Sequence, residues 1–133
     1  MNHEKNNTLK RHILVADADL NFLKTIEFLL EVRNYQVSLV NSGYDALVLL
    51  EKASQQEPVI DLLITDIFLP GLSGIDLIDA INYYHFKMPV VVISGMLNER
   101  LRCQIRACGV TACFSKPFDE NDLLRQVSSL LSV

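Results

Sequence analysis

The sequence is poor in the features that mark several large classes of protein. Its longest apolar runs fall well short of the roughly 20 residues that cross a membrane, and the N-terminal MNHEKNNTLKR lacks the apolar core of a signal peptide. The net charge is -4 and no basic stripe stands out, so binding to a nucleic-acid backbone is not expected. A composition that is half apolar and about a fifth charged excludes disorder and fibrous repeats. We therefore expect a cytoplasmic domain without membrane or nucleic-acid contacts of its own.

Cysteine is also scarce. The chain has three, an odd number, and none forms a Cys-x-x-Cys pair: Cys103, Cys108 and Cys113. Such a set does not build a disulfide framework or a zinc site. We expect three buried, reduced thiols.

Short apolar segments alternate with helical patterns along the whole chain. The strand-like segments are 12–16, 36–40, 62–64, 89–94 and 112–115, and the helical periodicities cover 22–30, 42–50, 75–81, 97–108 and 119–131. Asp19, Ser42 and Asp119 are placed to cap helix starts, and Asn34 to end the first helix. Strict alternation predicts an α/β fold, a parallel sheet covered on both faces. With 133 residues, we expect one domain over 11–133 after a polar lead-in at 1–10.

Four of the predicted strands end at polar side chains. Asp17 follows the first strand, Asp66 the third and Lys116 the fifth, while Ser94 ends the fourth. In a parallel sheet the ligand crevice lies outside the carboxyl ends of the strands. Mg²⁺ prefers carboxylate, water and phosphate oxygens, and a hydroxyl and an ammonium can donate to the oxygens that the metal leaves free. This edge is therefore predicted to bind a hard cation together with a phosphoryl group.

Four segments, in this order and spacing, resemble the receiver domain of two-component response regulators, the CheY-like family: ILVADAD, DLLITDIFLPGLSG, VVVISG and FSKPF. The resemblance runs from about Arg11 to the C-terminus. It implies a flavodoxin-like (βα)5 three-layer sandwich with strand order 2-1-3-4-5. It also implies a cis bond between Lys116 and Pro117.

The resemblance implies a role for each residue at the predicted edge. Asp66 would accept a phosphoryl group from the phosphohistidine of a sensor histidine kinase or a phosphotransfer protein. Asp17, Asp66 and the backbone carbonyl of Phe68 would hold Mg²⁺. Ser94 would contact the phosphoryl group and Lys116 would neutralise it. The domain would then be a signalling phosphoacceptor in a phosphorelay rather than an enzyme.

The same resemblance implies a partner surface, formed by the fourth helix, the fifth strand and the fifth helix. An output domain, a target protein or a second copy in a homodimer would bind there. The residues of this surface do not identify the partner; they include Arg100, Arg102 and Arg106.

Two positions depart from the family pattern. Family members usually carry adjacent acids after the first strand, and here the second position is Ala18, with Asp19 one residue too far along. We therefore predict weak Mg²⁺ binding and expect Asp19 to cap the helix instead. Cys113 stands where the family usually has an aromatic ring that moves inward on activation. The change in surface that reports activation is therefore expected to differ.

The sequence leaves two alternative functions open. One is a degenerate receiver that acts through protein contacts without efficient phosphorylation. The other is a haloacid-dehalogenase-type phosphatase, because Asp17-Ala18-Asp19 matches its D-x-D motif, with a nucleophile followed by a general acid/base. That family needs a late acidic pair where this chain has Lys116-Pro117, and it gives Asp66 no role.

Overall fold

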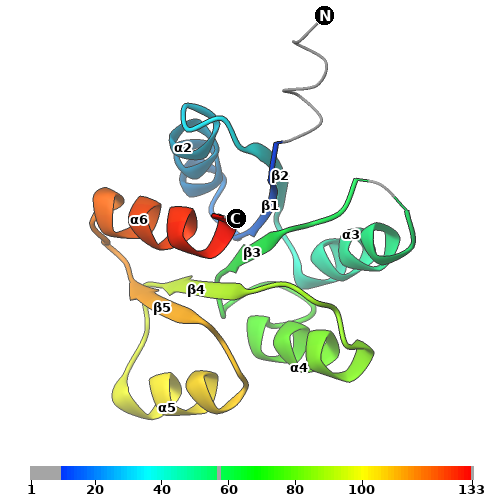
Figure 1. Ribbon diagram of the computed structural model, residues 1–133. Helices are drawn as coiled ribbons and strands as arrows, with labels where there is room; N and C mark the ends of the chain where they lie inside the picture. The colour runs from blue at the N-terminus through cyan, green and yellow to red at the C-terminus, as the bar shows by residue number, and fades with distance from the viewer. Residues whose placement is uncertain (1–9, 57, 133) are drawn as a thin grey trace, which may run out of the picture.

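In the computed structural model, residues 10–56 and 58–132 are described, and they form five strands alternating with five helices (Figure 1). The strands are β1 (His12–Ala16), β2 (Gln36–Val40), β3 (Leu62–Thr65), β4 (Val90–Ser94) and β5 (Ala112–Ser115). The helices are α2 (Leu20–Glu31), α3 (Gly43–Gln55), α4 (Gly74–Tyr84), α5 (Glu99–Ala107) and α6 (Glu120–Leu131). The predicted alternation is confirmed. The predicted lead-in over 1–10 lies, apart from Lys10, outside the described residues.

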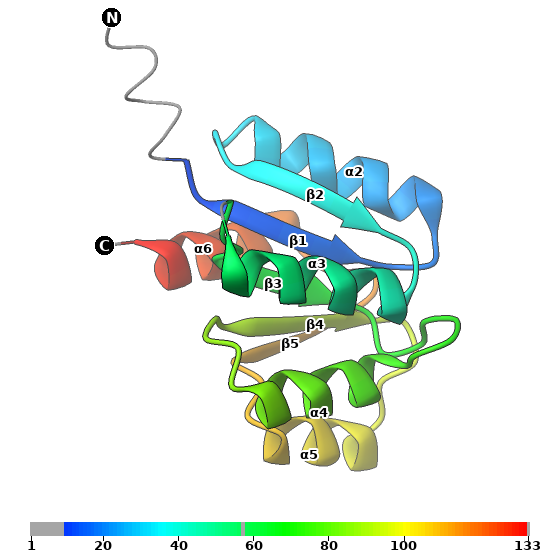
Figure 2. The same ribbon diagram turned by 90° about the vertical axis from the view of Figure 1, so that its right-hand side faces the viewer.

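All the strand pairs are parallel, and the order across the sheet is β2-β1-β3-β4-β5, as expected. β3 is therefore the central strand and β2 an edge strand. Ala16 lies opposite Thr65 in the β1–β3 register, so the residues that follow them, Asp17 and Asp66, leave the sheet side by side. In Figure 2 the arrows of β1 and β2 point the same way, toward the edge where this pair lies.

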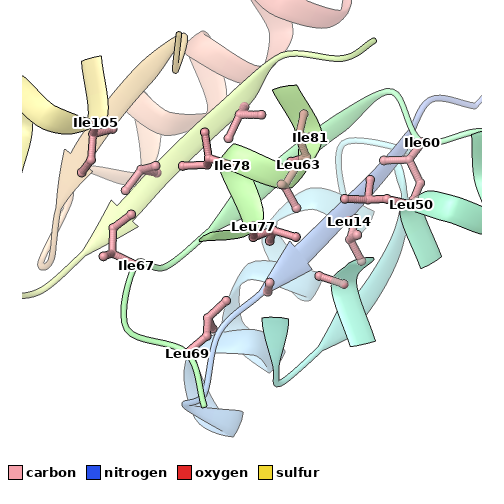
Figure 3. Close-up of a cluster of buried hydrophobic side chains, with 14 residues drawn as sticks. Leu14, Leu50, Ile60, Leu63, Ile67, Leu69, Leu77, Ile78, Ile81 and Ile105 are labelled. Carbon is pink, nitrogen blue, oxygen red and sulfur yellow. The ribbon is translucent and has the colours of Figure 1, made fainter. Parts of the chain in front are cut away.

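Apolar side chains fill both faces of the sheet. On one face α3, α4 and α5 pack against β1, β3 and β4, and Figure 3 shows this cluster around Leu14, Leu63 and Leu77. On the other face α2 and α6 pack against the alternate residues of the same strands. Because these strands are buried on both faces, their sequences are nearly continuous apolar runs. The first charged side chain after each of β1 and β3 therefore stands where the strand leaves the core, at Asp17 and Asp66.

A polar side chain caps the start of each helix in the described residues, accepting a backbone N–H of the first turn: Asp19, Ser42, Ser73, Asn98 and Asp119. The caps predicted at Asp19, Ser42 and Asp119 are confirmed. Asn34 does not end α2, which stops at Glu31 with Val32 as its C-cap. Asn34 instead takes a left-handed conformation (φ 70°) in the turn that leads to β2.

The three cysteines are free thiols, but their predicted burial is only partly right. Cys108 and Cys113 are half-buried, whereas Cys103 is exposed. Cys103 lies on the solvent face of α5, whose buried residue is Ile105. Among the described residues, no helix is both long enough and apolar enough to cross a membrane.

Candidate functional site

Backbone hydrogen bonds fix where the site residues leave the sheet. The N–H of Asp66 donates to the carbonyl of Ala16 at 3.0 Å, which ties the end of β3 to the end of β1 beside Asp17. The N–H of Lys116 donates to the carbonyl of Ser94 at 2.9 Å, which ties the end of β5 to the end of β4. The four predicted site residues therefore stand at one edge of the sheet, as their strand-end positions suggested.

Three of these residues form one charged cluster. The Nζ of Lys116 lies 2.7 Å from Oδ2 of Asp17 and 3.4 Å from Oδ2 of Asp66. The Asp17 side chain is 3% exposed, that of Asp66 12% and that of Lys116 23%. Two carboxylates thus share one ammonium at a partly desolvated edge, where each ion pair is screened less than at the surface.

Backbone donors hold the second oxygen of each carboxylate. Oδ1 of Asp17 accepts the N–H of Asp19 at 2.8 Å. Oδ1 of Asp66 accepts the N–H of Ile67 at 2.6 Å and that of Phe68 at 3.3 Å. These bonds fix both carboxyl groups in orientation, so that each directs its remaining oxygen, Oδ2, at the lysine.

Ser94 and Phe68 belong to the edge without joining the charged cluster. Ser94 is fully buried, and its Oγ accepts the N–H of Met96 at 3.4 Å. It lies opposite Ser115, the residue before Lys116, in the β4–β5 register. Within the described residues no hydrogen bond links Ser94 to Asp66. The side chain of Phe68 is half exposed, and the backbone N–H of Phe68 donates to Oδ1 of Asp66.

One aromatic ring that the sequence did not assign to the site lies against the lysine, and a second ring packs against the first. The Nζ of Lys116 is 4.1 Å from the centroid of the Phe22 ring. The ring of Phe118 meets that of Phe22 edge-on, with centroids 5.9 Å apart. The helical spacing predicts Phe22 only as a core residue of α2. No local signal in the sequence predicts its contact with Lys116, 94 positions later. The only sequence signal for an aromatic ring near this lysine is Phe118, two residues after Lys116.

Gly74 brings the start of α4 against the loop that follows β3. A Cβ at this position would stand 2.3 Å from the carbonyl oxygen of Asp66 and 2.7 Å from the Cα of Ile67. The N–H of Gly74 donates to the carbonyl of Ile67 at 2.8 Å. Only glycine allows this approach, a requirement that the sequence showed merely as a turn signal.

The residues present do not fit a resident magnesium ion in this arrangement. The acid that the family usually places next to Asp17 is Ala18, so only two carboxylates converge. Their two free oxygens are both directed at Lys116. In the described part of the chain no group of three His, Cys, Asp or Glu side chains is arranged to hold a metal. The cation that this donor set holds is the ammonium of the lysine.

Asp19, the second acid of the D-x-D motif, does not face the site. Its carboxylate accepts the N–H of Asn21 at 2.9 Å and that of Phe22 at 3.3 Å, as the N-cap of α2. A general acid/base must reach the reacting group, and this carboxylate is committed to the helix. The phosphatase alternative therefore loses its second catalytic residue.

Cys113 borders a cavity of about 300 Å³ between α5 and β5. Burial raises the pKa of its thiol, and the nearby guanidinium groups of Arg102 and Arg106 offset part of that rise. Burial likewise raises the pKa of Cys108, with a smaller contribution from Asp79. Raised pKa values leave these thiols protonated, as expected of core fillers rather than redox centres.

Residues 13–128 match the family model of the response regulator receiver domain. The chain belongs to that family. It is 29% identical over 119 residues to the transcriptional regulatory protein CpxR of Escherichia coli, covering 90% of this chain and 48% of CpxR. It is 32% identical over 140 residues to the two-component response regulator ORR4 of rice, covering 90% of this chain and 59% of ORR4. The chain thus spans about half the length of these relatives.

Solved receiver domains share the fold. A response regulator receiver domain protein from Clostridium thermocellum superposes with a TM-score of 0.82 at 26% identity, covering 91% of this chain and 94% of that one. The chemotaxis protein CheY4 of Vibrio cholerae superposes with a TM-score of 0.78 at 21% identity, covering 92% and 99%. The molecule is therefore the receiver domain of a response regulator in two-component signalling. Such domains are signalling proteins, and they typically bind Mg²⁺ in the acidic pocket.

Proposed function

We propose that the domain, over residues 11–133, accepts a phosphoryl group on Asp66 from the phosphohistidine of a sensor histidine kinase or phosphotransfer protein. The observation that carries this proposal is the orientation of Asp66. Its Oδ1 is held by two backbone N–H groups, while its Oδ2 points at the Lys116 ammonium 3.4 Å away. A carboxylate held this way presents one defined oxygen to an incoming phosphorus atom.

The transfer exchanges one bond for another. Oδ2 of Asp66 attacks phosphorus as the new O–P bond forms and the N–P bond of the phosphohistidine breaks. The electron pair of the broken bond stays on the imidazole nitrogen, which takes up a proton. Negative charge spreads over the phosphoryl oxygens during the transfer. The ammonium of Lys116 already lies beside the acceptor, so it stabilises that charge without reorganising.

The response follows from the change in charge at Asp66. Phosphorylation replaces one negative charge with about two, which draws Lys116 away from Asp17 and toward the phosphoryl oxygens. The buried hydroxyl of Ser94, at the end of the neighbouring strand, moves to meet the same oxygens. These shifts pass to the surface formed by α5, β5 and α6, where an output domain, a target protein or a second copy binds. With three free thiols, we place the domain in the cytoplasm.

A second candidate is a receiver that signals through protein contacts without efficient phosphorylation. The loss of the second acid at Ala18, together with the lysine that already occupies both free carboxylate oxygens, favours this alternative. Both candidates share the fold and the partner surface. They differ only in whether Asp66 is modified.

Intact-mass measurement after incubation with acetyl phosphate and Mg²⁺ tests the proposal. The wild type should gain one phosphoryl group, and Asp66→Asn should gain none. Asp61→Asn is the matched control, because this carboxylate also lies beside β3 and is partly buried, but it pairs with Arg11 at 3.5 Å, at the opposite end of the strand. That variant should still be phosphorylated. If the mass gain persists in Asp66→Asn and disappears in Asp17→Asn, the phosphatase function replaces the one proposed.

A further inference from the structure

We propose that Phe22 is a positioning residue. Its ring holds the ammonium of Lys116 on Asp17, and the lysine is thereby the resident cation of the pocket in place of a magnesium ion. The proposal deepens the function proposed above and rests on it for the role of the pocket. It concerns the resting state, before any phosphoryl group arrives.

The ammonium of Lys116 has three neighbours on different groups. It lies 2.7 Å from Oδ2 of Asp17, 3.4 Å from Oδ2 of Asp66 and 4.1 Å from the centroid of the Phe22 ring. A cation over the face of an aromatic ring is attracted by the ring quadrupole, more strongly where water is excluded. Here the lysine side chain is 23% exposed and Asp17 only 3%. The ring therefore adds to the same geometry that the shorter ion pair favours.

The Phe22 ring is itself held in place from two sides. Its own backbone N–H donates to the Asp19 cap at 3.3 Å in the first turn of α2. The ring of Phe118 packs edge-on against it, at an interplanar angle of 77°. Phe118 follows Lys116 by two residues, so the segment after β5 is joined to the start of α2 by the ring pair and to the end of β1 by the ion pair. The lysine is thus clamped between its own segment and the segment that carries Asp17.

A magnesium ion would compete with this lysine for the same two oxygens. Both Oδ1 atoms are occupied by backbone N–H groups, and both Oδ2 atoms face Nζ of Lys116. A third carboxylate that could hold the metal without displacing the ammonium is missing at Ala18. Binding of Mg²⁺ therefore requires the ammonium to retreat, and the ring of Phe22 opposes that retreat. Removing the ring should make the metal bind more tightly.

Titration of the unphosphorylated domain with Mg²⁺, monitored by NMR chemical shifts, tests this competition between the metal and the lysine. Phe22→Leu should bind Mg²⁺ about 2- to 30-fold more tightly than the wild type, because the lysine is held less strongly. Phe22→Tyr keeps an aromatic face and should retain the wild-type affinity. Phe28→Leu is the matched control: it removes an aromatic ring from the same helix at a site that is 67% exposed, and it should change nothing. Equal affinities in the wild type and Phe22→Leu would overturn the proposal, as would tighter binding in Phe28→Leu.

A second readout applies to the wild type alone and decides the matter if Phe22→Leu does not fold. Protons on the end of the Lys116 side chain lie over the ring face and should show an upfield ring-current shift. A wild-type spectrum without that shift would overturn the proposal. Neither readout requires Asp66 to react. If Asp66 is never phosphorylated while both results hold, the proposed function fails and the role of Phe22 stands.

Discussion

Lys116 is the residue on which the charge of the pocket depends. It supplies one positive charge to two carboxylates, and the shorter of its two ion pairs is to Asp17 rather than to Asp66, the proposed acceptor. At rest the cluster carries a net negative charge of one. When Asp66 gains a phosphoryl group, the stronger attraction moves to that side. We therefore propose that Lys116 responds to phosphorylation by moving from Asp17 toward the phosphoryl oxygens.

Replacing this lysine separates its signalling role from any structural one. Lys116→Ala should stay folded and accept a phosphoryl group more slowly, but show no spread of chemical-shift changes toward α5 on phosphorylation. Leaving the buried Asp17 without its partner should lower the free energy of unfolding by about 1–3 kcal/mol. Two-dimensional ¹H–¹⁵N spectra, with and without phosphodonor, measure the response, and Lys24→Ala on the exposed side of α2 is the control. A Lys116→Ala variant that is unfolded would show that the residue has mainly a structural role.

Ala18 is the residue that we propose lowers the affinity for magnesium. Adding a negative charge a few ångströms from a cation is worth on the order of 1–4 kcal/mol, depending on the effective dielectric constant. That free energy corresponds to about tenfold to nearly a thousandfold in affinity. Ala18→Asp should therefore bind Mg²⁺ more tightly than the wild type and accept phosphoryl groups faster. Calorimetric titration compares the two proteins, and equal affinities would mean that another group already fills the place of the missing acid.

The three cysteines should react in an order set by exposure and pKa. Cys103 is exposed and should be alkylated first. Burial raises the pKa of Cys113 and of Cys108, so less of each is thiolate at a given pH, and both should react more slowly. Mass spectrometry after timed exposure to iodoacetamide at pH 8 gives the order, with denatured protein as the control for full reaction. Fast labelling of Cys113 in the folded domain would contradict this assignment.

At the scale of elements, the contact between α4 and the end of β3 positions Asp66, the proposed acceptor. Gly74 begins α4 where a Cβ would stand 2.3 Å from the carbonyl oxygen of Asp66. The helix can approach this closely only because residue 74 has no side chain. The orientation of Asp66 therefore depends on a neighbouring helix as well as on its own strand.

Gly74→Ala should push α4 away from the loop that follows β3. Overpacking of this kind costs about 1–3 kcal/mol, and the displaced loop should slow phosphorylation of Asp66. Gly109→Ala is the comparison: its Cβ would meet nothing within 4 Å, but its φ of +87° makes any side chain strained. Both variants should unfold at lower denaturant concentration, and only Gly74→Ala should be phosphorylated more slowly. Equal phosphorylation rates in the two variants would contradict the role given to Gly74.

The elements were predictable from the sequence because each one carries a local signal. Continuous apolar runs marked the buried strands, and the residues at their ends marked the pocket, while Asp19, Ser42 and Asp119 marked helix starts. The contact of Phe22 with Lys116 was not predictable, because it joins two segments whose spacing in the sequence carries no record of their distance in space. The exposure of Cys103 was missed for a different reason: its spacing alone does not fix which face of a short helix turns toward solvent.

At the scale of the whole molecule, the pocket and the proposed partner surface meet at β5. Ser115, the residue before Lys116, accepts a hydrogen bond from the guanidinium of Arg102 on α5. Beside it, Cys113 leaves a cavity of about 300 Å³ at the position where the resemblance to receivers implies an aromatic ring. In the proposed function, movement of Lys116 toward a phosphoryl group would pull on β5, the strand that contacts α5. We propose that the signal passes to the surface through Ser115 and Arg102, without an aromatic ring to report it.

The chain spans about half the length of the regulators that it resembles, so the domain is expected to act as a module that a phosphoryl group switches. Everything proposed for the module depends on which carboxylate is modified. Asp66 and Asp17 lie at one edge and share one lysine, so a gain in mass alone does not distinguish them.

Reductive trapping of the modified residue tests the central claim most directly. Borohydride converts an aspartyl phosphate to homoserine, and peptide mass spectrometry then locates the change in the sequence. After incubation with acetyl phosphate, homoserine should appear at position 66 and at no other aspartate, and it should be absent without the phosphodonor. Homoserine at position 17 would contradict the account and favour the phosphatase chemistry. A phosphoryl-free protein under the same conditions would favour a receiver that signals by contacts alone.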